Sequence, residues 1–353
     1  MTDRSNQWIV QQIQECKTGN NLWCCDENIL HEVTDAHDWP AKPLLISNRW
    51  DLAEKATQIG FNSQFNDFDL GGIADNSVDN FFYRISKEKA VVHHLINQVL
   101  RVLKPLGTLY LCGQKSEGIK TYIEKACTLL ACEKKIQKDG ASYSSYLCKN
   151  TLSSGHPTAK VEDSNYTELR EIARFNNQLI FSKPGQFGWN KIDEGSAFLI
   201  DEISSLLAEQ VTSYESCLDL GCGYGFLSIA SQYLPIKHRT LTDNNAAALI
   251  SAHRNSVHFQ LPAEIVASDA GASIDRRFDL ILCNPPFHQG FSIDGDLTDK
   301  FLLNTKRLLA FDGVAYFVVN QFIPLEKKAR SHFKTVNCLA QNKSFKVLEL
   351  RIF

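Results

Sequence analysis

A glycine-rich segment in the second half of the chain, SCLDLGCGYGFLSIA at 216–230, constrains the fold most. Its apolar run reads as a buried strand that ends in Gly221, Gly223 and Gly225, after which the pattern becomes helical. Glycine is needed where the backbone takes positive φ or where a ligand comes too close for a Cβ. A strand, glycine turn and helix in succession are typical of a parallel α/β sheet, whose ligands bind at the carboxyl ends of the strands.

The spacing of these glycines favours one class of ligand. The dinucleotide pattern G-x-G-x-x-G requires a glycine where this chain has Phe226, and Asp219 stands ahead of the turn. The pattern D-x-G-x-G-x-G resembles motif I of class I S-adenosylmethionine-dependent methyltransferases. A carboxylate suits the ammonium of that cofactor, whereas it would repel a phosphate. The resemblance implies that Asp219, Gly221, Gly223 and Gly225 hold the methionine part of S-adenosylmethionine.

Two further acids follow the next expected strands. Asp243 ends RTLTD and is placed to accept hydrogen bonds from both ribose hydroxyls of the cofactor. Asp269 ends EIVASD and resembles the acid that receives the adenine amino group. The alternative for each is a solvated acid or a helix N-cap, because aspartate favours such turns.

The segment FDLILCNPPFHQGF at 278–291 supplies the candidate chemistry. An apolar strand delivers Asn284, Pro285, Pro286 and Phe287 to the same sheet edge. Asn-Pro-Pro-aromatic resembles motif IV of methyltransferases that act on planar amines, namely adenine N6, guanine N2 or the glutamine side-chain amide. A proline-rich turn without chemistry is the structural alternative.

These residue types suit methylation of a weakly nucleophilic amine. If the Asn284 side-chain oxygen and the Pro285 carbonyl each accept one N–H, the nitrogen is held with its electron density toward the methyl carbon. The prolines stiffen the loop, and Phe287 offers a face for a base swung out of its stack. We expect Cys283 to pack in the core and to take no part in the reaction.

The first half of the chain repeats the pattern without its motifs. Strands are expected at 43–47, 108–113 and 142–150, the last exposed or at an edge; helices are expected at 90–103 and 119–131. Residues of the first half match residues of the second at a constant separation along the chain. The four matching pairs are Arg101 and Arg307, Leu103 and Leu309, Gly107 and Gly313, and Tyr110 and Tyr316. No glycine cluster follows the strand at 43–47, and Arg84, Ile85, Ser86 and Lys87 stand in place of the Asn-Pro-Pro-Phe motif.

These observations predict an α/β protein of two tandem Rossmann-like class I methyltransferase domains, the N-terminal one degenerate. The polar stretch 151–165 is the best linker, so we place a degenerate, supporting domain at 1–155 and the catalytic domain at 156–353. Chance recurrence of helix-turn-strand units is the alternative to duplication.

NPPFHQG, together with KPGQFGWNKIDEGSAFLIDEI at 183–203, resembles the bacterial small-subunit ribosomal RNA guanine-N2 methyltransferases of the RsmC type. The resemblance implies methylation of the exocyclic N2 of a guanine in 16S rRNA, within the 30S subunit or an assembly intermediate. It also implies that Phe187, Lys191, Asp193 and Gly195 help to close the cofactor pocket. Gln289 resembles the residue found at this position in the sister group that methylates large-subunit RNA. A large-subunit target therefore stays open as an alternative.

Composition narrows the partners. A chain of 353 residues suits two domains, and eleven cysteines without a C-x2-C pair argue against a metal site or a disulfide framework. The N-terminus shows no apolar targeting segment, so we expect a cytoplasmic protein with no membrane partner. We also expect a monomer with no metal partner. Because the net charge is -3, contacts with RNA must be local. The candidate basic groups are Lys87, Lys89, Arg101 and Lys104 in the first half, and Lys327, Lys328, Arg330 and Lys334 in the second.

Three other functions were weighed. A protein-glutamine methyltransferase of the release-factor kind usually has a small helical first domain, whereas this chain has a second α/β pattern. A DNA adenine methyltransferase is the second alternative. The third is a non-catalytic RNA-binding module that keeps only the fold, against which the intact Asp219, Gly221 and Asn284 argue.

Overall fold

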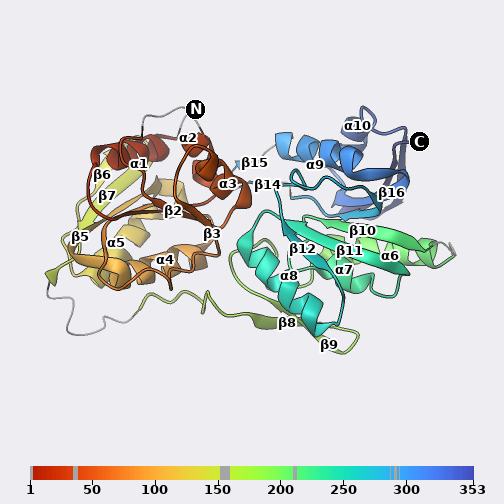
Figure 1. Ribbon diagram of the computed structural model, residues 1–353, viewed down its shortest axis with the longest axis horizontal. Helices are drawn as coiled ribbons and strands as arrows, with labels where there is room; N and C mark the ends of the chain where they lie inside the picture. Colours follow the sequence, from red (N-terminus) through yellow and green to blue (C-terminus); the bar gives the residue numbers. More distant parts are fainter. Residues whose placement is uncertain are drawn as a thin grey trace. The chain divides into compact units, whose positions relative to one another are not determined.

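The computed structural model describes residues 3–34, 39–151, 160–209, 213–286, 288–289, 292–293 and 295–353. The chain divides into two units, Met1–Thr167 (unit 1) and Glu168–Phe353 (unit 2), shown in Figure 1. Unit 1 therefore extends beyond residue 155, where the sequence placed the end of the first domain. None of the helices in the described ranges combines the length and the apolar character needed to span a membrane.

Unit 1 is built on a seven-stranded sheet in the order β3-β2-β1-β4-β5-β7-β6. The first five strands pair in parallel, and β7 pairs antiparallel with both β5 and β6. The strands are β1 (Asn21–Cys25), β2 (Leu44–Ser47), β3 (Ser63–Phe65), β4 (Val78–Arg84), β5 (Leu103–Gln114), β6 (Gln137–Asp139) and β7 (Ser142–Cys148). Its helices are α1 (Arg4–Glu15), η1 (Glu27–Ile29), α2 (Leu30–Thr34), α3 (Trp50–Gln58), α4 (Lys89–Val102), η2 (Lys115–Glu117) and α5 (Ile119–Leu130).

The expected strands and helices of unit 1 are confirmed, with one correction. The strand at 142–150 was expected to be exposed or at an edge, but β7 is mostly buried and lies between β5 and β6. The edge strand is β6, whose three exposed residues, Gln-Lys-Asp, carry no apolar alternation that would reveal a strand.

Unit 2 repeats the arrangement in the order β12-β11-β10-β13-β16-β18-β17. Its strands are β10 (Tyr214–Leu220), β11 (Ile236–Asp243), β12 (Glu264–Ala267), β13 (Phe278–Cys283), β16 (Leu309–Asn320), β17 (Thr335–Gln341) and β18 (Phe345–Arg351), with two separate hairpins, β8 (Arg170–Phe175) with β9 (Gln178–Ser182) and β14 (His288–Gln289) with β15 (Ser292–Ile293). The helices are α6 (Glu194–Glu209), α7 (Phe226–Ala230), α8 (Ala246–His258), α9 (Gly295–Leu308) and α10 (Leu325–Ala329).

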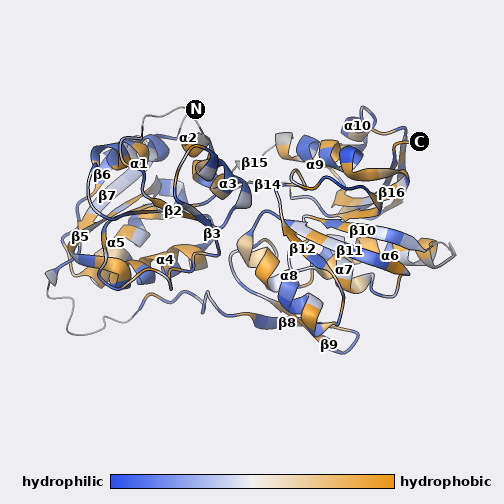
Figure 2. Ribbon diagram, in the orientation of Figure 1, coloured by the Kyte–Doolittle hydropathy of each residue, from blue (hydrophilic) through white to orange (hydrophobic). Residues whose placement is uncertain are grey.

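Burial explains why these segments form strands and helices. The interior of β16 is a continuous buried apolar run, as expected of a sheet covered on both faces. In Figure 2 the hydrophobic colour follows β16, whereas helices such as α1 and α9 alternate between hydrophobic and hydrophilic. Helix α8 begins after Asn245, whose side chain accepts hydrogen bonds from the amides of Ala247 and Ala248.

The strand registers confirm the internal duplication. Phe81 pairs with Leu109 in unit 1 as Ile281 pairs with Ala315 in unit 2, and the same register irregularity falls near the start of β4 and β13. Arg101 and Arg307 also make equivalent contacts, since Arg101 donates hydrogen bonds to carbonyls of the loop before β4 and Arg307 to carbonyls of the loop before β13. Arg101 therefore stabilises the fold, and Lys104 is paired with Asp79.

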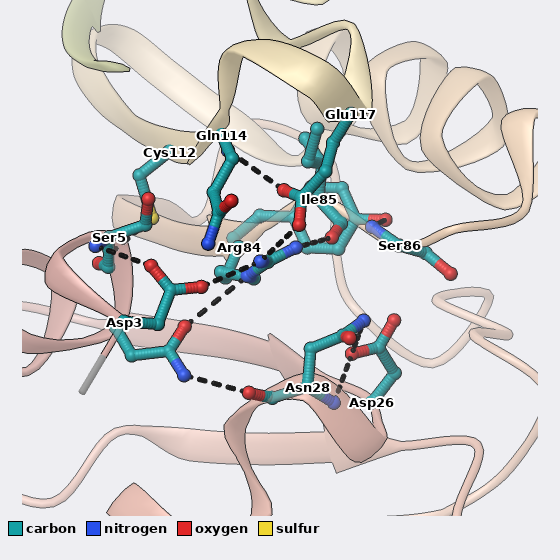
Figure 3. A network of polar contacts seen from close by, with 12 residues as sticks. Asp3, Ser5, Asp26, Asn28, Arg84, Ile85, Ser86, Cys112, Gln114 and Glu117 are labelled. Carbon is teal, nitrogen blue, oxygen red and sulfur yellow. Dashed lines mark hydrogen bonds and ion pairs between the residues drawn. The ribbon is translucent and has the colours of Figure 1, made fainter. Parts of the chain in front are cut away.

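The position of the catalytic motif in unit 1 is filled by a buried ion-pair network. Arg84 is the last residue of β4, at the register position where Asn284 follows β13, and its side chain is 4 % exposed. Its guanidinium donates to Asp3 at 2.8 Å and to Glu117 at 2.7 Å, as Figure 3 shows. At the register position of Asp219 stands Trp23, which is fully buried. Unit 1 is thus degenerate at both motifs.

The third cofactor position of unit 1 is closed by a residue from the end of the linker. Asp67 matches Asp269 in register, and the buried Tyr166 donates its hydroxyl proton to the Asp67 carboxylate. The Tyr166 ring lies 4.7 Å from that of His94, between ring centroids. Val161 is held by the side chain of Asn97 on α4. Residues 160–167 therefore pack against unit 1, and Tyr166 enters its core.

Replacing Arg84 tests whether this network stabilises unit 1. Arg84→Ala leaves the buried Glu117 carboxylate without its cation, so we expect unit 1 to lose about 3–5 kcal/mol of unfolding free energy. Urea unfolding followed by tryptophan fluorescence measures the loss, because four of the five tryptophans lie in unit 1. The exposed pair of Arg4 with Asp139 supplies the control, because Arg4→Ala should change stability by less than about 1 kcal/mol. Equal effects of the two substitutions would contradict this assignment.

Candidate active site

The two motifs of unit 2 meet at one edge of its sheet. β10 and β13 are parallel neighbours, and Leu220 pairs with Cys283 at their carboxyl ends. Adjacent strands lie about 4.8 Å apart, so the next residues along each chain, Gly221 and Asn284, are neighbours. The glycine turn and the Asn-Pro-Pro motif therefore face a common site.

The glycine turn needs its glycines for backbone conformation and for space. Gly221, Gly223 and Gly225 have φ values of 75°, 54° and 86°, in the left-handed region that side chains disfavour. A Cβ on Gly225 would also lie 3.1 Å from the Leu241 side chain. Around Gly223, by contrast, the nearest atom to such a Cβ is 3.9 Å away, so the turn leaves room for a ligand at this position.

Asp219 connects the strand before the glycine turn to the helix after it, and it keeps one unpaired oxygen. Its side chain is fully buried, and Oδ2 accepts hydrogen bonds from the Ser228 amide at 3.0 Å and the Ser228 hydroxyl at 2.8 Å. Oδ1 has no hydrogen-bond partner among the described residues. Burial raises the pKa of Asp219 to about 7, an effect that the Ser228 hydrogen bonds oppose.

Gln186 is a buried site residue that the sequence reasoning missed. Its Nε2 donates to the hydroxyls of Ser182 and Ser251 and to the Ala247 carbonyl, which orients the amide. Its Oε1 is buried, has no partner among the described residues and is the atom nearest to a Cβ placed on Gly223. The residue stands beside Phe187 in the sequence, but nothing in the pattern separates it from an ordinary loop glutamine.

The acids at the ends of β11 and β12 are both engaged. The Asp243 carboxylate accepts from the amides of Gly223 and Asn245, each at 2.9 Å, so it ties the glycine turn to β11. Asp269 forms an ion pair with Lys300 of α9. Both acids are partly exposed at the edge where the glycine turn lies.

Asn284 is oriented by two residues from the start of α6. Its Nδ2 donates to Asp193 Oδ1 at 2.7 Å and lies 2.9 Å from the Ser196 hydroxyl oxygen. A carboxylate can only accept, so the amide nitrogen must face Asp193 and the oxygen Oδ1 must point away. Oδ1 makes no hydrogen bond to the described part of the chain, which leaves it available as an acceptor for a substrate.

The residues of the segment before α6 make different kinds of contact. Phe187 is 82 % exposed, and the Lys191 side chain pairs with Glu194 at the surface. The Lys191 carbonyl accepts a hydrogen bond from Tyr224 Oη at 3.1 Å, which connects this segment to the glycine turn. Gly195 is required by close packing, since a Cβ there would lie 3.1 Å from the Phe345 ring.

The rest of the Asn-Pro-Pro motif is partly described. Pro285 is buried and Pro286 is exposed, whereas Phe287 lies outside the described residues. Cys283 is fully buried, and burial raises the pKa of its thiol well above the usual value. Such a thiol stays protonated and packs in the core, as expected from the sequence.

The raised pKa of Asp219 predicts a dependence of stability on pH. The folded state keeps the Asp219 proton up to about pH 7, whereas the unfolded chain loses it near the ordinary value of 3.8. Between these values the folded state binds more protons, so the contribution of Asp219 to stability falls as pH rises. Asp219→Asn does not titrate and should gain relative to wild type by up to about 1.4 kcal/mol per pH unit in this window.

Urea unfolding of unit 2 at pH 5 and pH 8 measures this difference. The control is Asp275→Asn, because Asp275 is exposed. If Asp219→Asn and wild type lost stability in parallel between the two pH values, the buried-acid assignment would be wrong.

Comparisons with known proteins agree with this geometry. Residues 177–349 match the model of the methyltransferase small domain family. The chain is 33 % identical over 191 residues to a protein of Haemophilus influenzae strain Rd, named ribosomal RNA small subunit methyltransferase C, a match that spans 54 % of this chain and 56 % of that one. A Shewanella pealeana protein of the same name is 28 % identical over 77 % of each chain.

A solved structure shares the fold of both units. The T. thermophilus 16S rRNA N2 methyltransferase RsmC, determined in complex with AdoMet and guanosine, aligns with a TM-score of 0.81 and 21 % identity. The alignment covers 99 % of this chain and 92 % of the other. With its tandem fold and the methyltransferase motifs brought to one edge, the chain is similar to the proteins named ribosomal RNA small subunit methyltransferase C.

Proposed function

We propose that the protein transfers a methyl group from S-adenosylmethionine to the exocyclic N2 of a guanine in 16S rRNA. The observation that carries the proposal is the Asn284 amide, fixed by Asp193 next to the glycine turn with its oxygen turned away from Asp193. Relatives over most of the chain are named for small-subunit rRNA methylation, and the T. thermophilus structure holds AdoMet and guanosine.

The described residues suit the positive end of this cofactor. Bound S-adenosylmethionine supplies an electrophilic methyl group on a sulfonium, next to an ammonium. Asp219 Oδ1 and Gln186 Oε1 are buried acceptors without a partner in the described chain, beside a turn with space for a ligand. Leaving such acceptors unpaired costs free energy that a bound cation would recover. The residues that we propose to hold the cofactor are Phe187, Lys191, Gly195, Asp219, Gly221, Gly223, Gly225, Asp243, Asp269 and Asn284, whereas Asp193 acts on the pocket through Asn284.

The chemistry of the chain itself is positioning. Asn284 Oδ1 accepts one N–H of the guanine amine, and the Pro285 carbonyl accepts the other. When both protons are held in this way, the electron pair of the guanine N2 points toward Gly221. Gly221 lies on the side of the sheet edge where the cofactor binds. Positioning of this kind supplies most of the acceleration without a covalent intermediate. Pro286 and Phe287 complete the proposed catalytic set.

Asp193 enters this scheme as a positioning residue. Its carboxylate caps α6 by accepting from the Ser196 amide at 2.8 Å and at the same time fixes Asn284. One acid therefore couples the start of α6 to the orientation of the amide.

We further propose how the chain divides its work. The C-terminal domain, predicted at 156–353, is catalytic, and the N-terminal domain, predicted at 1–155, supports it; the two compact units of the folded chain divide between Thr167 and Glu168. The substrate is the 30S subunit or an assembly intermediate, and the protein acts as a cytoplasmic monomer without a metal. All eleven cysteines are free thiols, which suits a reducing compartment. The alternative target within the same chemistry is a guanine of the large-subunit RNA.

Methyl transfer to both ribosomal subunits from a strain lacking the enzyme tests the proposed function. Wild type should place tritiated methyl groups on the small subunit, and nucleoside analysis should give N2-methylguanosine. Asn284→Ala should lose about 100-fold or more in kcat, because an acceptor aimed at the reacting amine is gone. Methyl groups on adenine, on protein or on the large subunit alone would overturn the assignment.

Asp193→Asn tests the orientation of the amide. An asparagine at 193 can donate as well as accept, so the Asn284 amide is no longer forced to present its oxygen, and we expect kcat to fall by about 10- to 100-fold. Binding of S-adenosylmethionine, measured by calorimetry, should change by less than about threefold. Glu194→Gln, next in the chain and exposed, is the matched control. An equal loss in cofactor affinity and in kcat would instead make Asp193 a cofactor ligand.

A further inference from the structure

Phe322 presents an aromatic ring to solvent from a fixed turn. It is 82 % exposed and follows the last residue of β16, Asn320. The Phe322 amide donates to Asn320 Oδ1 at 3.1 Å, and the Ile323 amide donates to the Asn320 carbonyl at 3.0 Å. Gln321 is held through its amide to the Ser344 carbonyl at 2.8 Å. The turn keeps this ring outside the core, although burial would be favourable.

The strand order places this turn on the substrate side of the site. The glycine turn and both cofactor acids follow β10, β11 and β12, which lie on one side of β13. β16 is the parallel neighbour of β13 on the other side, with Phe317 paired to Cys283. Phe322 therefore emerges at the same edge as Asn284, away from the cofactor strands.

Two cations follow Phe322 on the adjoining helix. Lys327 and Arg330 are exposed, and neither forms an ion pair within the described ranges. The other members of this basic run are engaged: Lys328 pairs with Asp299, and the Lys334 ammonium lies 5.2 Å from the centre of the Phe353 ring. The acid within the helix, Glu326, is paired with Lys346. The charge that remains available in the segment after Phe322 is therefore positive.

We propose that Phe322, Lys327 and Arg330 form a binding surface for the single-stranded RNA next to the target guanine. Phe322 stacks on the base of a flanking nucleotide, and the two cations contact backbone phosphates. An exposed ring with cations alongside is the arrangement by which proteins hold unpaired RNA, since every base has a stacking face and every nucleotide a phosphate. Because the Phe322 ring is open to solvent, it suits a nucleotide next to the target guanine. The target guanine itself reaches Asn284.

Stacking and phosphate contacts can be separated by salt, because only the latter release counterions. Methyl transfer to small subunits from a strain lacking the enzyme gives kcat/KM, and binding of a labelled single-stranded 16S rRNA fragment is measured over a range of salt concentrations. Phe322→Ala should lower kcat/KM for the subunit by about 5- to 150-fold with an unchanged salt slope, and Phe322→Trp should keep near wild-type values. The double variant Lys327→Gln, Arg330→Gln should reduce the magnitude of the salt slope by about 1.4.

Matched controls lie at the opposite edge of the sheet. Tyr233 is 52 % exposed just before β11, and Lys306 is exposed near the end of α9, so Tyr233→Ala and Lys306→Gln should leave RNA binding unchanged. S-adenosylmethionine affinity should be the same in all variants. The proposal is overturned if Phe322→Ala stays within twofold of wild type, if Phe322→Leu is as active as Phe322→Trp, or if the double variant keeps the wild-type salt slope.

The inference rests on the proposed function, and the two can fail separately. If wild type makes no N2-methylguanosine on the small subunit, the proposed function has failed. If wild type makes it and the variants at 322, 327 and 330 behave like the controls, only the RNA surface has failed.

Discussion

The parallel pairing of β10 with β13 is the constraint on which the rest of the site depends. Because Leu220 and Cys283 are partners in register, the turn after one strand and the motif after the other must open at the same edge. A slip of one residue would turn Asp219 to the opposite face of the sheet and break its hydrogen bonds to Ser228. The buried Asp219 is thus tolerated because it fixes the start of α7 and with it the shape of the glycine turn.

The two units show one fold with and without a site. Where unit 2 has a glycine turn, an exposed edge and an oriented asparagine, unit 1 has Trp23, an ion-paired Arg84 and the Tyr166 hydroxyl on Asp67. Asp67 stands at the register position of Asp269, but its carboxylate accepts a hydrogen bond from the buried Tyr166. Unit 1 therefore fills the positions of the cofactor site with its own side chains.

The sequence predicted the fold and the meeting of the two motifs, because glycine turns, strand ends and apolar periodicity are local signals. It could not predict what depends on contacts between distant residues. Asp193 was assigned to the cofactor pocket, and only the folded chain shows its carboxylate on Asn284. Tyr166 follows a stretch that read as linker, and no local pattern reveals that it enters the core of unit 1. Gln186 and the edge strand β6 likewise lack a pattern that separates them from loop residues.

The most direct test of the account is a crystal structure of the chain with S-adenosylhomocysteine and guanosine. The account predicts one cofactor molecule per chain, bound over the 221–225 turn of unit 2, with its sulfur directed at the guanine amine and Asn284 Oδ1 accepting from that amine. A cofactor in unit 1, or a guanine whose amine lies away from Asn284, would contradict it.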